Sequence, residues 1–121
     1  MKLLIVDDDA FLREMYALKF SEDGHNVVTA EHGVDALRIY QQDSTFDVVL
    51  LDMIMPGMTG TELIEKLRNL YPDSTAKYIV LSNQGQQEDI DKATAAGADG
   101  YIIKADTIPS GVVKRVTKIA T

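Results

Sequence analysis

Four short runs of consecutive apolar residues recur along the chain. They cover residues 3–6, 48–51, 78–81 and 101–103, and no polar residue interrupts them. An unbroken apolar run is typical of a strand covered on both faces, as in a parallel sheet between two layers of helices. A fifth run, residues 26–30, contains more polar positions, so we expect it at an edge of the sheet.

Between the runs, apolar residues recur with the period of a helix. Helices are predicted over residues 10–23, 34–42, 61–71, 87–96 and 109–121. The residues that mark their apolar sides are, in the same order, Phe11, Met15 and Leu18; Val34, Leu37 and Tyr40; Leu63, Leu67 and Leu70; Ile90 and Ala93; and Val112, Val113, Val116, Ile119 and Ala120.

Punctuating residues agree with these helix ends. Gly24 and Pro72 follow two of the predicted helices as stop signals, and Thr59 and Glu62 have the spacing of a capping box at the start of a third. Strand and helix thus alternate five times. This alternation predicts an α/β fold, a doubly wound (βα)5 sandwich around a five-stranded parallel sheet. With 121 residues and no linker or repeat, the sequence predicts one domain over residues 1–121.

Composition excludes several classes of function. The chain has no cysteine, so it has no disulfide, cysteine nucleophile or thiolate metal site, which suits the reducing cytoplasm. No apolar run approaches 18 residues, and we expect no membrane segment. The net charge of −7 argues against direct binding of nucleic acid. The excess acid lies in residues 1–60, which hold 4 basic and 11 acidic residues.

A charged or hydroxyl residue follows or ends four of the predicted strands, at positions where an apolar residue would be buried at a lower cost in free energy. In a doubly wound sheet, ligands bind beyond the carboxyl ends of the strands, where the strand order reverses. The residues in question are Asp7, Asp8 and Asp9 after the first strand, Asp52 after the third, Ser82 after the fourth and Lys104 after the fifth.

These side chains suit phosphoryl transfer. If the first and third strands are neighbours, Asp7, Asp8 and Asp52 converge, and two like charges about 4 Å apart repel by about 4 kcal/mol. Lys104 offsets one of the three negative charges, and a bound Mg2+ fits the negative charge that remains. Asp52, ionised as aspartates are at neutral pH, then serves as nucleophile. Asp9 is instead expected to cap a helix, and His25 and His32 to lie on the surface.

Together these motifs resemble the receiver domain of two-component response regulators. The resemblance covers essentially the whole chain and rests on four elements: the Asp7–Asp8 pair, residues 52–60, Ser82 and residues 97–104. Successive intervals are 44 residues from Asp8 to Asp52, 30 from Asp52 to Ser82 and 22 from Ser82 to Lys104. The resemblance implies a flavodoxin-like fold with the strand order 2-1-3-4-5, which the chemotaxis member of the family exemplifies.

The resemblance also implies a signalling protein rather than a conventional enzyme, although one that catalyses its own phosphorylation and dephosphorylation. Asp52 would accept a phosphoryl group from a sensor histidine kinase or phosphotransfer protein. Asp8, Asp52 and the backbone carbonyl of Ile54 would ligate Mg2+, and Asp7 would act mainly through metal-bound water. The output would pass to a downstream protein or effector domain.

Three further side chains would serve the phosphorylated state in such a domain. Lys104 would pair with the phosphoryl group. Ser82 would move toward it, and Tyr101 would rotate into the space left behind. This mechanism predicts that the segment 87–121 carries the readout of phosphorylation.

Three positions depart from the common family pattern. Asn83 stands where a small residue is usual, and Ala105 follows Lys104 where proline is usual, so a cis peptide bond is not expected there. Gly100 replaces an acidic residue that is frequent in members that dimerise, and we expect a monomer or weak dimer.

Alternative functions are less well supported. A dehalogenase-type phosphatase would match Asp7-x-Asp9 but requires a later acidic motif, whereas residues 82–85 contain no acid. A flavin carrier would need a phosphate loop where three aspartates stand. A receiver-like binding module that is not phosphorylated is the remaining alternative. The sequence names neither the kinase, the stimulus nor the output.

Overall fold

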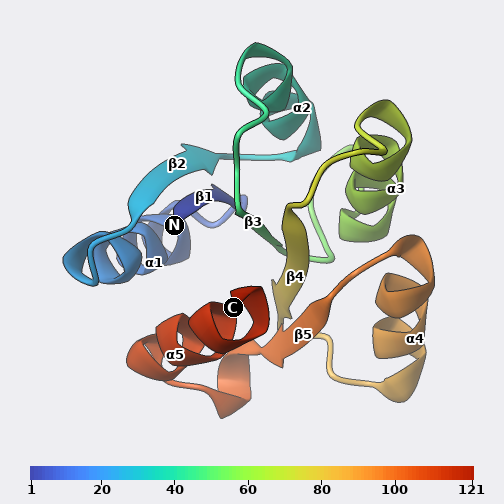
Figure 1. Ribbon diagram of the computed structural model, residues 1–121. Coiled ribbons are helices and arrows are strands. Elements are labelled where there is room, and N and C mark those ends of the chain that lie inside the picture. Colours follow the sequence, from blue (N-terminus) through green and yellow to red (C-terminus); the bar gives the residue numbers. More distant parts are fainter.

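The computed structural model describes residues 1–121 as five strands that alternate with five helices (Figure 1). Every predicted element is present, with ends within one residue of the prediction. A short 3-10 turn, Lys104–Asp106, separates the last strand from the last helix. The strands are β1 (Lys2–Val6), β2 (Asn26–Ala30), β3 (Val48–Leu51), β4 (Lys77–Ser82) and β5 (Gly100–Ile103), and the helices are α1 (Ala10–Glu22), α2 (Gly33–Gln42), α3 (Gly60–Leu70), α4 (Gln87–Ala96) and α5 (Pro109–Ala120).

All five strands are parallel, in the order β2-β1-β3-β4-β5, which confirms the predicted fold and places β2 at an edge. The register aligns the strand ends, because Val6 pairs with Leu51 and Ser82 pairs with Ile103. Asp7 and Asp52, one residue beyond that first pair, therefore lie side by side. Lys104 likewise follows Ile103 at the same edge of the sheet.

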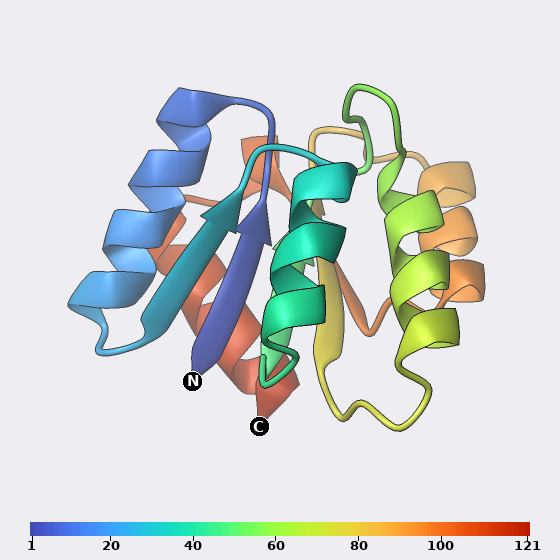
Figure 2. The ribbon, with the colours of Figure 1, turned by 90° about the horizontal axis from the view of Figure 1, so that it is seen from above.

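Helices cover both faces of the sheet, α1 and α5 on one side and α2, α3 and α4 on the other (Figures 1 and 2). Alternate residues of the central strands enter the two cores: Leu4 and Val6 face one, Leu3 and Ile5 the other. Such burial on both faces is the reason for the unbroken apolar runs. In Figure 2 the strands point toward the loops at the top, where the polar strand ends gather.

Four residues of the predicted apolar sides do not face the core. Phe11 and Leu18 are 76% and 59% exposed, and Val34 and Leu70 are exposed as well. On α1 the buried pair is instead Tyr16 and Phe20. Helix α1 carries apolar residues around much of its circumference, so periodicity identified the helix but not its inner side.

Helix ends follow the predicted capping signals. Thr59 caps α3: its hydroxyl accepts from the Glu62 amide, and the Glu62 carboxylate accepts from the Thr59 amide. Gly24 follows α1 with φ of +88°, a conformation that few side chains tolerate. None of the helices combines the length and the apolar character needed to cross a membrane.

Candidate functional site

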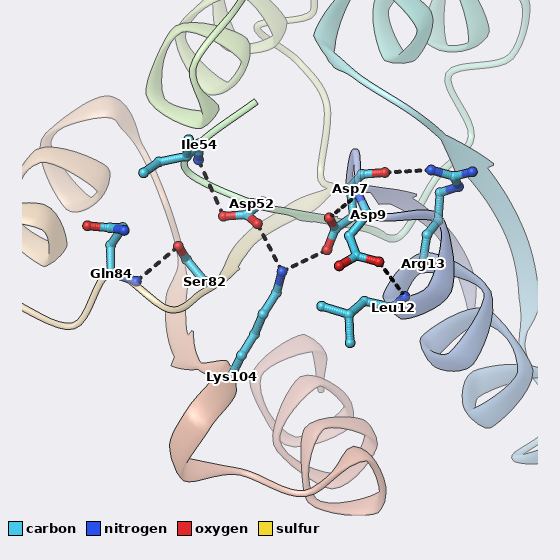
Figure 3. A network of polar contacts seen from close by, with 9 residues as sticks. All are labelled: Asp7, Asp9, Leu12, Arg13, Asp52, Ile54, Ser82, Gln84 and Lys104. Carbon is cyan, nitrogen blue, oxygen red and sulfur yellow. Dashed lines mark hydrogen bonds and ion pairs between the residues drawn. The ribbon is translucent and has the colours of Figure 1, made fainter. Parts of the chain in front are cut away.

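The carboxyl ends of β1, β3, β4 and β5 surround a shallow cavity of about 330 Å³. The cavity collects the strand-end residues singled out from the sequence, and Figure 3 shows how several of them converge. A larger hollow between α1 and α5 also has charged side chains, but its lining includes none of the residues that close the strands. The residues that line it are Asp7, Asp8, Asp9, Leu12, Asp52, Ile54, Ser82, Asn83, Gln84 and Lys104.

Asp7 is the most deeply buried acid of the site, with 3% of the residue exposed. Its Oδ1 accepts a hydrogen bond from the Asp9 amide at 3.0 Å, and its Oδ2 accepts one from Nζ of Lys104 at 2.8 Å. The backbone carbonyl of Asp7 accepts from Nη1 of Arg13 at 2.8 Å. The first two contacts fix the carboxylate, and the third, from Arg13, holds the backbone of Asp7 and was not predicted from the sequence.

Asp52 reaches the cavity from the end of β3, and its side chain is 14% exposed. One carboxylate oxygen accepts from Lys104 at 2.9 Å, and the other accepts from the Ile54 amide at 3.3 Å. The loop that follows is held by three buried side chains, those of Met53, Met55 and Met58. A carboxylate on a well-anchored loop, still open to solvent, is suited to act as a nucleophile.

Gly60 permits a close approach between that loop and α3. Its amide donates to the Met53 carbonyl at 2.9 Å. A Cβ at this position would collide with the Asp52 carbonyl and come within 2.9 Å of the Met53 Cα. Helix α3 therefore begins directly against the backbone that carries Asp52.

Lys104 bridges Asp7 and Asp52 with an ammonium that is almost enclosed, its side chain being 8% exposed. Burial by itself lowers the pKa of this lysine, but hydrogen bonds and charge attraction from the two carboxylates outweigh it, so the pKa is raised. The ammonium thus keeps its positive charge throughout the neutral pH range, beside the Asp52 carboxylate.

Asp7, Asp8 and Asp52 each place a carboxylate oxygen within 4.8 Å of the other two. Asp8 is exposed, whereas the other two are largely enclosed. Three carboxylates face one ammonium, which leaves an excess of two negative charges. An all-oxygen donor set with this excess fits a hard divalent cation such as Mg2+. The structure thus brings together the aspartates predicted as metal ligands.

The remaining predicted ligand is the backbone carbonyl of Ile54. Ile54 lines the same cavity, and its amide already contacts Asp52. Asp9 caps α1, as expected, because its Oδ1 accepts from the Leu12 amide at 3.1 Å. Its side chain is therefore engaged in the helix start.

Ser82 and Tyr101 are both hydrogen-bonded to the backbone of Gln84. Ser82 is 1% exposed, and its Oγ accepts from the Gln84 amide at 3.2 Å. The half-buried Tyr101 donates its hydroxyl hydrogen to the Gln84 carbonyl. Burial raises the pKa of Tyr101, and the charges of Asp89 and Asp52 act in the same direction, so the hydroxyl stays protonated as a donor. Gln84 was not predicted, since its backbone acts and the sequence carries no signal for that.

The three departures from the family pattern have definite places. Asn83 is exposed and lines the cavity. Ala105 lies in the 3-10 turn, and the chain contains no cis peptide bond, as expected. Gly100 lies against α5, where a Cβ would come within 2.7 Å of the Ile119 methyl group, so a larger residue would displace that side chain.

The histidines required correction. His25 was predicted to lie on the surface, but its side chain is only 12% exposed, between the Met1 amino group and Asp23. It fills the gap beside Phe20 at the end of α1. His32 is half-buried and caps α2 through Nδ1, which accepts from the Asp35 amide at 3.3 Å. Both lie outside the cavity, as expected.

A flavodoxin-like sheet whose carboxyl edge gathers three aspartates, a serine and a lysine defines the receiver class of signalling domains. Residues 3–112 match the family described as response regulator receiver domain, and the chain belongs to this family. It is similar to the CheY-type members.

Two chemotaxis relatives align along nearly their whole length. Chemotaxis protein CheY of Halobacterium salinarum is 33% identical over 120 residues, 99% of this chain and 97% of the relative. Chemotaxis protein CheY of Thermotoga maritima is 36% identical, with coverage of 98% and 97%. The solved structure of Vibrio cholerae chemotaxis protein CheY4 superposes with a TM-score of 0.90 at 30% identity, covering 98% of this chain and 97% of that one.

Proposed function

We propose that residues 1–121 form one phosphoacceptor receiver domain, in which Asp52 takes a phosphoryl group from a phosphohistidine of a sensor histidine kinase or phosphotransfer protein. The observation that carries this proposal is the contact of 2.9 Å between Asp52 and a buried, charged lysine at the mouth of an acidic cavity. In the reaction the donor's N–P bond breaks and an O–P bond to an Asp52 oxygen forms. The ionised carboxylate supplies the electron pair, so Asp52 needs no general base.

Lys104 supports the transfer electrostatically. Its ammonium is enclosed and points at the carboxylate that gains the phosphoryl group. A preorganised cation in a partly dehydrated site stabilises negative charge on phosphoryl oxygens more strongly than it would in water. Because the pKa of Lys104 is raised, the cation is present at every pH at which the domain would work.

Mg2+ is the cofactor that we propose for this site. Asp8, Asp52 and the Ile54 carbonyl would hold the ion directly, and Asp7 would act mainly through metal-bound water. When bound, the ion neutralises charge on the phosphoryl oxygens. Asp7 and Asp52 each retain contacts to neighbouring amides, from Asp9 and Ile54, which keep the carboxylates oriented.

Ser82 and Tyr101 would form the switch. A phosphoryl group on Asp52 gives the Ser82 O–H a strong, charged acceptor, and rotation of the side chain toward it would carry Oγ away from the Gln84 amide. If Ser82 turns away, the loop that Gln84 belongs to loses one of its two hydrogen bonds to β4 and β5. Tyr101 would then leave the Gln84 carbonyl and turn inward.

The direct test of phosphorylation uses intact mass spectrometry after incubation with acetyl phosphate. We expect one added phosphate in the presence of Mg2+, no label with a chelator, and no label in Asp52→Ala. Asp9→Ala is the matched control, because that carboxylate caps a helix, and it should still be labelled. Labelling of Asp52→Ala to the wild-type level would remove Asp52 from its role. No labelling of the wild type would favour the receiver-like binding module.

The role of Lys104 can be separated from that of the metal. Lys104→Ala removes a cation that competes for Asp7 and Asp52, so Mg2+ affinity should stay the same or rise. Phosphorylation-dependent changes should weaken, because a phosphoryl oxygen loses its charged partner. Titration with Mg2+ followed by NMR checks the first point, and a large loss of affinity would contradict it.

The readout of phosphorylation is proposed to lie in residues 87–121. Addition of beryllofluoride and Mg2+, which mimics the phosphoryl group, should shift backbone amide resonances from α4 to α5. Shifts confined to the surroundings of Asp7, Asp8 and Asp52 would contradict this. A downstream protein or effector domain would bind that face, and we propose a monomer or weak dimer in the cytoplasm. Apart from its own phosphorylation and dephosphorylation, the domain would catalyse no reaction.

A further inference from the structure

One charged side chain beside the site has no part in the function proposed so far. Arg13 extends from the first turn of α1 back toward the end of β1, and its side chain is 12% exposed. Its Nη1 donates to the backbone carbonyl of Asp7 at 2.8 Å (Figure 3). Its Nη2 lies 3.8 Å from a carboxylate oxygen of Glu31, in the loop after β2. A nearly enclosed guanidinium thus contacts the site through its main chain rather than through one of its carboxylates.

The contact with Arg13 takes the place of a hydrogen bond that the sheet no longer supplies. Beyond Val6, the last residue of β1, the Asp7 amide still donates to the Ala30 carbonyl at 3.2 Å. The Asp7 carbonyl has no backbone partner and accepts from Arg13 alone. Because a peptide unit is planar, the direction of this carbonyl also sets the direction in which the chain continues into Asp8. Arg13 therefore fixes the peptide that joins Asp7 to Asp8.

Asp8 is the acid of the site whose own side chain is held least. The carboxylates of Asp7 and Asp52 each accept two hydrogen bonds, one of them from Lys104. The Asp8 carboxylate accepts none from the protein, and the residue is exposed. Its oxygen nevertheless lies within 4.8 Å of the oxygens of the other two acids. That placement depends on the main chain, which Arg13 holds.

We propose that Arg13 is a positioning residue for Asp8: by holding the peptide between Asp7 and Asp8, it keeps the Asp8 carboxylate directed toward the Mg2+ position. A guanidinium suits this task, because a hydrogen bond from a charged donor is stronger than one from a neutral donor. A carbonyl acceptor suits it as well, since it leaves the carboxylates free for the metal. This inference rests on the proposed function, which assigns Asp8 to Mg2+.

Charge and positioning predict opposite effects of removing Arg13. A positive charge near the acids repels a cation, so the loss of that charge alone would raise Mg2+ affinity, as expected for Lys104→Ala. The loss of the contact with the Asp7 carbonyl instead lets Asp8 turn away from the other acids, which lowers Mg2+ affinity. The sign of the change in affinity therefore separates the two roles.

The first test is a Mg2+ titration of Arg13→Met, followed by NMR. Methionine keeps a long apolar side chain but removes the donor and the charge. Mg2+ affinity should fall about tenfold, as is typical when a group that orients a metal ligand is lost. Lys66→Met is the matched control, because it removes the same charge from an exposed position of α3 that has no ion pair, and it should not weaken binding. Unchanged or higher affinity in Arg13→Met, or an equal loss in Lys66→Met, would overturn the inference.

A second readout needs no metal. In the metal-free protein, the order parameter of the Asp8 amide from 15N relaxation should be lower in Arg13→Met than in the wild type, and unchanged in Lys66→Met. An equally rigid Asp8 amide in Arg13→Met would overturn the proposal. Arg13→Gln is the substitute if the methionine variant does not fold, because the shorter side chain does not reach the Asp7 carbonyl, and it should give the same results.

Labelling with acetyl phosphate completes the test. Arg13→Met should raise the Mg2+ concentration for half-maximal rate about tenfold and leave the maximal rate at saturating Mg2+ unchanged, since Arg13 acts through a metal ligand. A lower maximal rate with an unchanged Mg2+ requirement would contradict this role. A wild type that binds no Mg2+ and takes up no phosphate would reject the proposed function. A wild type that does both, with Arg13→Met matching it, would reject only the role of Arg13.

Discussion

Helices α3 and α4 pack side by side on the same face of the sheet, yet they are held very differently (Figure 1). Helix α3 begins with a capping box and buries Leu63, Ile64 and Leu67 completely. Helix α4 begins at Gln87, its N-cap residue Gln86 makes no side-chain cap, and Ala93 is its single buried residue. Two neighbours of almost equal length thus differ in both the features that stabilise a helix in a protein.

The difference indicates which of the two can move at low free-energy cost. Elements with little buried apolar surface open more readily than the core. The end of α4 is tethered, since Arg68 of α3 donates to the Gly97 carbonyl at 2.7 Å. Movement is therefore cheapest at the start of α4, next to Ser82 and Gln84, where a phosphoryl group would act.

The largest expected effect comes from removing a core side chain of α3. Leu67→Ala should lower the free energy of unfolding by about 2–5 kcal/mol, because it deletes a fully buried side chain and leaves a cavity. Ile90→Ala in α4 should cost clearly less, since Ile90 is only partly buried. Urea denaturation measures both. Equal losses would show that α4 is as firmly packed as α3.

Removing the cap of α3 is the next strongest change. Thr59→Ala deletes the hydroxyl that accepts from the Glu62 amide and should cost about 1 kcal/mol. Thr75→Ala, at an exposed loop position, is the control and should be close to neutral. If both variants unfold at the wild-type urea concentration, the capping box does not stabilise α3.

Adding a cap to α4 should reduce the difference in stability between α3 and α4. Gln86→Ser supplies an N-cap oxygen where the structure has no side-chain cap, and should raise stability by about 0.5–1 kcal/mol. Amide hydrogen exchange in α4 should slow, and its response to beryllofluoride should shrink. Unchanged exchange in α4 would mean that its start is limited by something other than the missing cap.

The smallest effect concerns the surface of α4. Lys92 and Glu88 form an ion pair of 3.2 Å with both side chains more than half exposed. Lys92→Gln should therefore change stability by at most about 0.5 kcal/mol, and added salt should remove the difference. A larger loss in a thermal or urea transition would show that this pair contributes to the anchoring of α4.

Most of the fold could be predicted from the sequence. Strands buried on both faces leave unbroken apolar runs, whereas in helices the apolar residues recur every three or four positions. The convergence of Asp7 and Asp52 could be predicted as well, since each directly follows a strand of one parallel sheet. The buried side of α1 could not be predicted, because the helix has large apolar residues on two sides. Tyr16 and Phe20 face the core, and Phe11 and Leu18 are exposed.

Contacts made by the backbone were also beyond prediction from sequence. Gln84 binds Ser82 and Tyr101 through its amide and carbonyl, which every residue but proline has. The enclosure of His25 depends on the chain start lying beside the end of α1. Such contacts require the three-dimensional arrangement, because no residue type marks them.

Gly60 joins the backbone of Asp52, the proposed nucleophile, to the well-anchored helix α3. Since α3 starts against the Asp52 carbonyl with no side chain between them, the two form one rigid unit. Helix α4 has no such link to Asp52. If the proposed phosphorylation of Asp52 shifts α4, the shift is therefore a displacement relative to α3, which stays in contact with the Asp52 backbone. A partner that contacted both helices would then sense the change in their separation without contacting the phosphoryl group.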